Sequence, residues 1–208
     1  LTGSLNVPGR PNNIWVSGNY AYVTSDDNAE ELKIVDISNP SAPTPVGAYN
    51  ASGNANGLGV YVSGSYAYLT RQSSSAKELL IINVSTPSAP TLTGSLDLNG
   101  DGNEVVVIGN YAYIASTDDS QELQVVDITT PASPSLVGTF NLSGADNALS
   151  ITGLGSTIFV GKEGGNMHIL NVSTPSVPTE SGVYSAQGSV KDIAIGNSNT
   201  YAFIATGY

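Results

Sequence analysis

The chain has 208 residues, of which 40% are hydrophobic and 11% charged, and it is rich in Gly, Ser, Thr and Asn. This is the composition of a turn-rich β protein, and it excludes a disordered chain. Seventeen Asp and Glu against six Lys and Arg give a net charge of −11, so we expect no nucleic-acid partner. The absence of cysteine excludes disulfides, thiolate zinc sites and cysteine nucleophiles.

No apolar run approaches the roughly 20 residues that a membrane-spanning helix needs, so we expect no membrane insertion in this segment. The chain begins and stops within a repeat, and we therefore expect it to be a piece of a longer precursor whose remainder could include a signal peptide or an anchor.

The chain repeats itself every 44 to 47 residues. One glycine opens the same short segment in each copy, for example "GSLN" or "GAYN", and a fixed period of this length is the mark of a repeat architecture. The equivalent glycines are Gly3, Gly47, Gly94, Gly138 and Gly182.

The first two strands of each copy form a predicted hairpin. In "NIWVSGNYAYVTS" from Asn13, the dipeptide Gly18-Asn19 accepts the positive φ angles of a tight turn between two alternating apolar segments. A tyrosine usually opens the second strand, and its large side chain is expected to pack against a small alanine of the next blade. The second strands begin at Tyr20, Tyr66, Tyr111, Thr157 and Tyr201.

A third strand is predicted four times, each time followed by a proline that cannot donate to a sheet. The fourth strand is the segment that the repeated glycine opens. The predicted third strands begin at Leu32, Leu79, Leu123 and Met167.

Four antiparallel strands per unit predict an all-β fold, a β-propeller built from four-stranded blades. About five blades are represented, and the last one lacks a third strand. Either Leu1 to Asn6 closes a five-bladed ring against Asn197 to Thr206, or the chain belongs to a larger ring. The expected domain is a single propeller or partial propeller over residues 1–208, with units at about 3–46, 47–93, 94–137, 138–181, and 182–208 with 1–6.

The segments "KIVDISNPSAP" at Lys33 to Pro43 and "QVVDITTPASP" at Gln124 to Pro134 resemble the LVIVD repeat of secreted and surface proteins of bacteria and archaea. The resemblance covers nearly the whole chain. It implies an extracellular propeller, often part of a larger anchored protein, without a family-wide enzymatic activity.

A short polar residue ends each third strand and is followed two residues later by Ser or Thr. We expect it to accept backbone N–H bonds and fix the turn, in preference to forming a ring of functional groups. These residues are Asp36, Asn83, Asp127 and Asn171. Glycosylation sequons also occur, of which those at Asn50 and Asn141 lie where a glycan fits.

The segment "DLNGDG" resembles the opening of a calcium loop, in which Asp97, Asn99 and Asp101 supply alternating oxygens. Ile108 stands where an EF-hand has its Glu, so a shorter propeller-type calcium loop is the alternative to an ordinary turn between blades. Calcium is the one cofactor that the sequence suggests.

Other polar residues carry weaker signals. The loops "SDDNAEE" from Ser25 and "STDDSQE" from Ser116 are expected to be solvated tips. The single histidine, His168, lies in a third strand, and Trp15 lies in a first strand with an expected core or interblade role. No catalytic residue is assigned.

The leading hypothesis is a non-enzymatic extracellular propeller on a microbial cell surface. It serves as a structural or protein-interaction module, with other proteins or copies of itself as partners. The alternative is a propeller that binds a surface glycan or calcium through loops at Asn54, Asp101, Asp146 and Lys191. A second alternative is a hydrolase or lyase, which would need two carboxylates at one end of the channel.

Overall fold

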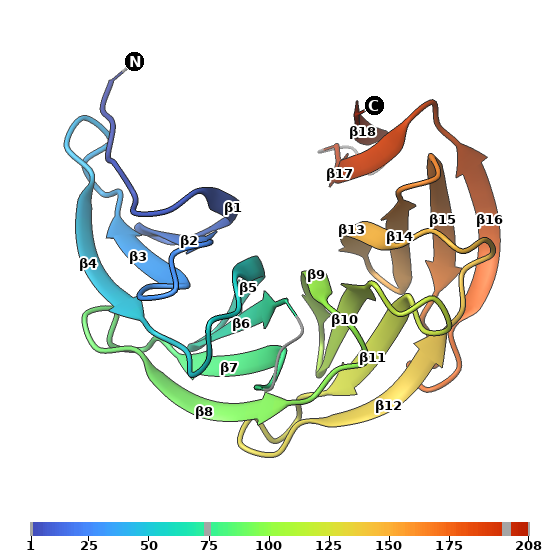
Figure 1. Cartoon of the computed structure of the whole chain (residues 1–208), viewed down its shortest axis with the longest axis horizontal. Helices are drawn as coiled ribbons and strands as arrows, with labels where there is room; N and C mark the ends of the chain where they lie inside the picture. Colours follow the sequence, from blue (N-terminus) through green and yellow to red (C-terminus); the bar gives the residue numbers. More distant parts are fainter. Residues whose placement is uncertain (1, 73–75, 197–200, 208) are drawn as a thin grey trace. The chain divides into compact units, whose positions relative to one another are not determined.

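The structure is a computed structural model that describes residues 2–72, 76–196 and 201–207 (Figure 1). The described residues form 18 strands and no helix. They build four antiparallel sheets of four strands each and one sheet of two strands. Each sheet of four is a blade whose strands are hydrogen-bonded in chain order, which confirms the predicted propeller blades.

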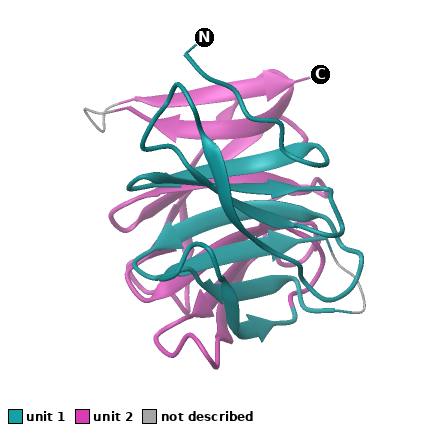
Figure 2. Cartoon of the chain, turned by 90° about the vertical axis from the view of Figure 1, so that its left-hand side faces the viewer, with its two compact units in different colours: residues 1–97 teal, residues 98–208 magenta. Residues whose placement is uncertain are grey.

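The chain divides into two compact units, residues 1–97 and 98–208, which Figure 2 colours separately. The first unit holds two blades. Blade 1 consists of β1 (Pro11–Ser17), β2 (Tyr20–Ser25), β3 (Leu32–Asp36) and β4 (Thr44–Tyr49), and blade 2 of β5 (Gly57–Ser63), β6 (Tyr66–Arg71), β7 (Leu79–Asn83) and β8 (Thr91–Leu96).

The second unit holds two full blades and a hairpin. Blade 3 consists of β9 (Gly102–Ile108), β10 (Tyr111–Ser116), β11 (Leu123–Asp127) and β12 (Ser135–Phe140). Blade 4 consists of β13 (Ala148–Leu154), β14 (Thr157–Lys162), β15 (Asn166–Asn171) and β16 (Thr179–Ser185), and blade 5 of β17 (Ser189–Ile195) and β18 (Ala202–Gly207).

Each sheet therefore ends on the glycine-led strand, whereas the units drawn from the sequence begin on it. A single propeller domain over residues 1–208 stays a prediction.

Local turn chemistry sets the hairpins as predicted. Gly18 adopts a φ of 57° in the two-residue turn between Ser17 and Tyr20, a conformation that only glycine takes without strain. At the end of β3, the Oδ1 of Asp36 accepts the Ser38 N–H at 2.8 Å. The Ser38 hydroxyl and N–H also lower the pKa of the Asp36 carboxyl.

The other three residues at this position behave in the same way. Asn83, Asp127 and Asn171 each accept the N–H two residues further on at 2.8 to 2.9 Å. The prediction of a turn-fixing role for this position is confirmed.

The repeated glycine of the fourth strand lies against the following blade of the same unit. A Cβ at Gly47 would collide with the backbone carbonyl of Pro87 in blade 2, and a Cβ at Gly138 would meet the carbonyl of Pro175 in blade 4. At Gly182 the described residues leave open space for a Cβ. The glycine is thus required where a neighbouring blade approaches its backbone.

The leading strand expected at Leu1 to Asn6 does not form over the described residues 2–6. A fourth strand needs a third strand as its hydrogen-bonding partner, and within the described part of the chain blade 5 has β17 and β18 only. The pairing expected with Asn197 to Thr206 falls in part on residues 1 and 197–200, which lie outside the described residues.

The core of unit 1 lies between its two blades. Tyr22 of blade 1 shares a buried cluster with Val60, Ala67 and Leu69 of blade 2, as the expected packing of tyrosine against alanine requires. Trp15 packs on this cluster and stacks on Tyr61 with ring centroids 4.1 Å apart. The expected interblade role of Trp15 is confirmed.

Candidate functional site

Each unit offers two kinds of candidate site: buried polar groups at the ends of the blades and exposed apolar faces. Because the strands of a blade are antiparallel, the β2–β3 connection and the connection to the next blade lie at the same end of the sheet. This loop end carries most of the ionisable residues that the sequence suggested as ligands.

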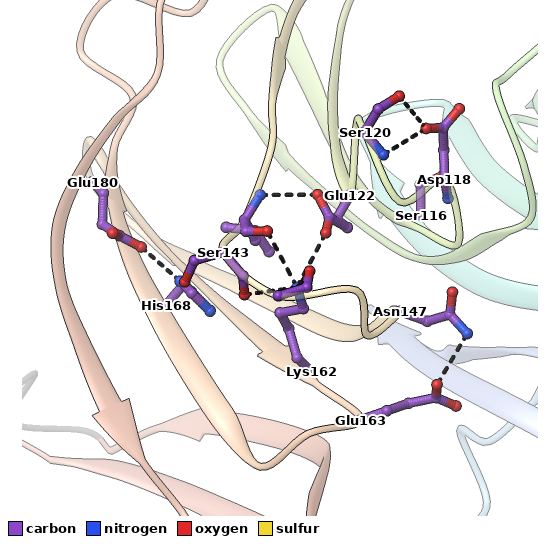
Figure 3. Close-up of polar contacts among 12 residues, drawn as sticks. Ser116, Asp118, Ser120, Glu122, Ser143, Asn147, Lys162, Glu163, His168 and Glu180 are labelled. Carbon is purple, nitrogen blue, oxygen red and sulfur yellow. Dashed lines mark hydrogen bonds and ion pairs between the residues drawn. The ribbon is translucent and has the colours of Figure 1, made fainter.

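A buried ion pair joins two blades at the loop end of unit 2 (Figure 3). Lys162, the last residue of β14, donates from Nζ to Glu122 Oε1 at 3.1 Å, and both side chains are at most 1% exposed. Glu122 Oε2 in turn accepts the Leu142 N–H at 2.8 Å. We call Glu122, Lys162 and the backbone of residues 142–144 the lysine clamp.

The backbone completes the lysine clamp. The carbonyl oxygens of Leu142, Ser143 and Gly144 lie 3.3, 3.1 and 2.9 Å from Lys162 Nζ. An ammonium has three protons, so these carbonyls and Glu122 share them. The clamp ties blade 3, its outgoing loop and blade 4 through one buried cation.

Unit 1 has a related arrangement, which we call the arginine clamp, with Arg71 at the position of the lysine. Glu31 Oε2 accepts the Ala51 N–H at 2.8 Å, and Arg71 donates to the carbonyls of Ser52 at 3.0 Å and of Lys77 at 2.7 and 3.0 Å. Both charged side chains are fully buried. Among the described residues Glu31 Oε1 is buried without a hydrogen-bond partner.

Burial has the largest effect on the pKa values of the two charged residues in the arginine clamp. It raises the pKa of Glu31, while the Ala51 N–H and the Arg71 charge oppose the rise, and it lowers the pKa of Arg71.

The acidic loops are thus not wholly solvated tips, which corrects the expectation from the sequence. Their last residues, Glu31 and Glu122, are fully buried. The signal was present in the sequence, because a Glu directly precedes the leucine that opens the third strand in three repeats. The tips themselves are held by local bonds, such as that from the Ser120 N–H to Asp118 Oδ1 at 2.9 Å.

His168 lies on β15 and pairs with the neighbouring strand (Figure 3). Its Nδ1 is 2.6 Å from Glu180 Oε1 of β16, and the ring is fully buried. Among the described residues its Nε2 has no hydrogen-bond partner. The pair holds the outer edge of blade 4 together.

The residues of the suggested calcium loop have protein partners. Lys77 Nζ donates to Asp97 Oδ2 at 2.8 Å and lowers the pKa of Asp97. The Asn99 side chain donates to Gln121 Oε1 at 3.1 Å, and the Asp101 N–H to Thr117 Oγ1 at 2.9 Å. Within the part of the chain that the structure describes, no three His, Cys, Asp or Glu side chains form a metal-binding group.

The calcium site stays a prediction, as does the ligand-binding surface at Asn54, Asp101, Asp146 and Lys191. Of these residues Asn54 lies in unit 1 and the other three in unit 2.

The second kind of site is an exposed blade face. We call the side of a blade that carries Ile14, Val16 and Val23 its leading face, and the side that carries Trp15, Tyr20 and Tyr22 its trailing face. In blade 2 the leading-face residues Val60 and Val62 are 2% and 6% exposed, because blade 1 covers them.

The first and last blades expose one face each. Ile14 and Val16 on the leading face of blade 1 are 61% and 56% exposed. On the trailing face of blade 5, Tyr201 and Phe203 are 68% and 64% exposed, although Tyr22, the counterpart of Phe203 in the hairpin register, is 4% exposed. Contiguous exposed apolar side chains of this size mark interaction surfaces.

A pocket opens on the leading face of blade 1. It has a volume of about 330 Å³ and a largely apolar lining. The lining residues are Val7, Pro11, Asn12, Asn13, Ile14 and Val23.

The four-stranded blades and their order define a β-propeller protein. The chain belongs to the LVIVD repeat family, which matches residues 8–51, 52–97, 99–142 and 147–186. The suspected family is therefore confirmed. No curated protein matches the sequence. Among the described residues no helix has the length and apolar character that crossing a membrane requires.

Several solved structures share the propeller fold. A Lactobacillus plantarum protein matches with a TM-score of 0.83 at 15% identity, over 94% of this chain and 64% of its own. A putative 6-phosphogluconolactonase from Bacteroides uniformis matches with a TM-score of 0.76 at 12% identity, over 93% of this chain and 62% of its own. The periplasmic gluconolactonase PpgL of Pseudomonas aeruginosa has a TM-score of 0.74 at 12% identity, over 91% of this chain and 60% of its own.

Two consequences follow from these likenesses. The chain spans less than two thirds of the length of these proteins, and at such identities the likeness shows the fold alone. The expectation that the protein is not an enzyme was wrong, because propellers that match most of this chain are named as lactonases. A lack of familiar catalytic motifs does not exclude catalysis in a fold that hydrolases share.

Proposed function

We propose that this chain is an interaction module of an extracellular β-propeller on a microbial cell surface, where it contacts another protein through its exposed blade faces. The observation that carries the proposal is the exposure of Ile14, Val16, Tyr201 and Phe203. The counterparts of Ile14 and Val16 in blade 2 are buried, as is Tyr22, the counterpart of Phe203.

The electrostatics support a protein partner. The net charge of −11 repels a phosphate backbone, and the large exposed side chains of the two faces are apolar or aromatic, with Asp192 beside Phe203 on the trailing face of blade 5. Interfaces between proteins concentrate aromatic and aliphatic side chains at their centres, as Phe203 and Ile14 would provide.

The location outside the cell is supported by the LVIVD resemblance. It is tested by treating intact source cells with a membrane-impermeant biotin reagent that reacts with the exposed Lys77 and Lys191. Labelling of the native protein before lysis, without labelling of a cytoplasmic marker, is the expected result. Labelling only after lysis contradicts the proposal.

The contact itself is tested by crosslinking on intact cells, followed by mass spectrometry of the linked peptides. Crosslinks that involve residues next to the two exposed faces are expected. Crosslinks that all lie at the acidic loop tips would favour the glycan- or calcium-binding alternative, for which calcium calorimetry and a glycan screen are the direct measurements.

The second candidate function is hydrolysis of a sugar lactone, which is the chemistry named for two structures that match more than nine tenths of this chain. The assay follows glucono-δ-lactone and 6-phosphogluconolactone in buffer with and without the protein. A rate that rises in proportion to protein concentration supports this candidate, and a rate equal to that of buffer alone removes it.

A further inference from the structure

We propose that Asn50 and Asn141 carry N-linked sugar chains in the native protein, whereas the sequons at Asn83 and Asn171 stay unmodified. A sequon is an Asn followed by any residue except Pro and then by Ser or Thr, and the sequence contains four. The inference rests on the proposed location outside the cell, because N-linked sugars belong to surface loops of secreted proteins. The structure of each sequon separates the two pairs.

Asn50 and Asn141 occupy the same position in blades 1 and 3, directly after the fourth strand. β4 ends at Tyr49 and β12 ends at Phe140, so each Asn opens the connection to the next blade. Both residues are exposed, and among the described residues neither side-chain amide has a hydrogen-bond partner. An exposed amide nitrogen of this kind is the acceptor that N-linked glycosylation uses.

The arginine clamp fixes the backbone of the sequon in unit 1. Its middle residue, Ala51, is buried and donates its N–H to Glu31 Oε2 at 2.8 Å. The carbonyl of Ser52 accepts a hydrogen bond from Arg71 at 3.0 Å. Asn50 and Ser52 themselves are exposed. Burial therefore alternates along the three residues, and the two side chains that define the sequon face solvent.

The lysine clamp holds the sequon of unit 2 in the same way (Figure 3). Leu142 is buried and donates its N–H to Glu122 Oε2 at 2.8 Å, and the Ser143 carbonyl accepts from Lys162 Nζ at 3.1 Å. Asn141 and Ser143 are exposed. Each clamp thus binds its sequon through the backbone alone, so a sugar on the Asn side chain displaces none of these buried contacts.

The sequons at Asn83 and Asn171 are closed by their own hydrogen bonds. Asn83 Oδ1 accepts both the N–H of Ser85 at 2.9 Å and its hydroxyl at 2.7 Å. Asn171 Oδ1 accepts the N–H of Ser173 at 2.8 Å. These bonds fix the turn after a third strand, and a transferase would have to open that turn to reach the amide. Their asparagines therefore have a role in folding that does not need a sugar.

The fold does not itself require Asn after the fourth strand. The equivalent residue is Asp97 in blade 2, which pairs with Lys77 at 2.8 Å, and Ser185 in blade 4. Since carboxylate and hydroxyl side chains also end this strand, the asparagines of blades 1 and 3 are not explained by the turn. Modification of the exposed amide gives them a role.

The modification forms one bond and breaks one. The donor is a sugar joined through its anomeric carbon to a lipid pyrophosphate, and a separate transferase brings it to the chain. The Asn Nδ2 forms a bond to the anomeric carbon, the bond from this carbon to the pyrophosphate oxygen breaks, and Nδ2 gives up one proton. The lipid pyrophosphate leaves with the electron pair, so no oxidant or reductant is needed.

The test is mass spectrometry of the protein isolated from its source cells. A protease that cuts after Asp and Glu places the four sequons on separate peptides, because Glu78, Asp97 and Asp146 lie between them. Electron-transfer fragmentation keeps a sugar on its residue and so locates it without knowledge of its composition. The expected result is a sugar mass on Asn50 and on Asn141, with none at the other two sequons.

Variants expressed in the source cells test the dependence on the sequon. Ser143→Ala should abolish the sugar on Asn141, and Ser143→Thr, which keeps the hydroxyl, should retain it. Asn54→Gln is the matched control. Asn54 is exposed and lies in the same connection as Asn50 but outside any sequon, so this variant should keep both sugars.

An unmodified Asn50 or Asn141 overturns the inference, as does a sugar on Asn83 or Asn171, or a sugar on Asn141 that survives Ser143→Ala. The biotin experiment separates this failure from failure of the proposed function. A protein that is labelled on intact cells but carries no sugar removes the inference and leaves the extracellular module in place. A protein that is labelled only after lysis and carries no sugar removes both.

Discussion

Removal of the buried ammonium in unit 2 should destabilise the protein strongly. Lys162→Met keeps the unbranched side chain and deletes the charge, which leaves Glu122 Oε1 and three backbone carbonyls without their donor. Breaking a buried ion pair by removing one partner costs about 3–5 kcal/mol, because the remaining charge has neither water nor a counterion. We expect a loss of this size in the free energy of unfolding.

The assay is urea unfolding followed by circular dichroism, together with calorimetry. Each kcal/mol shifts the Tm of a chain of this length by about 2–4 °C, so the Tm should fall by roughly 6 to 20 °C. Lys77→Met is the matched control. The Lys77 and Asp97 side chains are 50% and 67% exposed, and an exposed pair contributes at most about 1 kcal/mol.

The double variant Glu122→Gln, Lys162→Met separates the pair from its surroundings. It carries no unpaired buried charge, so it should be more stable than Lys162→Met alone. If the free energy of unfolding of Lys162→Met lies within about 1 kcal/mol of that of the unmodified chain, the buried pair does not hold blades 3 and 4 together.

Two further predictions concern unit 1 and the repeated glycine. Because burial raises the pKa of Glu31 above its ordinary value of 4.5, the folded chain holds this proton more tightly, and its contribution to stability is lost as the pH rises through the folded pKa. The free energy of unfolding of Glu31→Gln, relative to that of the unmodified chain, should therefore rise as the pH increases above 4.5. Urea unfolding at several pH values measures this difference, and a difference that does not change with pH would contradict the raised pKa. Gly47→Ala should lower the free energy of unfolding by about 1–3 kcal/mol, because its Cβ meets the Pro87 carbonyl. Gly182→Ala should cause no such loss, because a Cβ there has open space. Equal thermal stability of the two variants would contradict this prediction.

The blade architecture could be predicted from the sequence because its signals are local. Gly18 sets a hairpin within two residues, and Asp36 caps the end of a strand through its own side chain. Such features depend on neighbours along the chain, and their repetition at a fixed period reinforces each one. The repeated glycine could also be found from the sequence, because it recurs at a fixed period. The reason for it, the backbone carbonyl of a neighbouring blade, could not be predicted.

The clamps could not be predicted in the same way, because their partners come from different repeats. Glu122 meets a cation 40 residues further along the chain, at a position where the repeats differ. In unit 2 that position, the last residue of the second strand of a blade, is Ser116 in blade 3 and Lys162 in blade 4. Ser116 donates through Oγ to the Asn99 carbonyl at 2.7 Å, as Lys162 does to the Ser143 carbonyl at 3.1 Å. A buried carbonyl can be satisfied by several donors, so no single residue type marks the site.

The exposed faces are the hardest feature to find in a repeat sequence, and for a physical reason. Ile14 and Val60 occupy equivalent positions in near-identical hairpins, yet one is 61% exposed and the other 2%. Blade 1 packs over Val60, whereas Ile14 keeps most of its surface exposed. Every repeat carries the residues of an interblade interface on both sides, so the ends of any series of blades present one unpaired copy of each side. Equivalent residues can therefore be buried in one blade and exposed in another, and what covers the two exposed faces in the native protein decides whether they serve as binding surfaces.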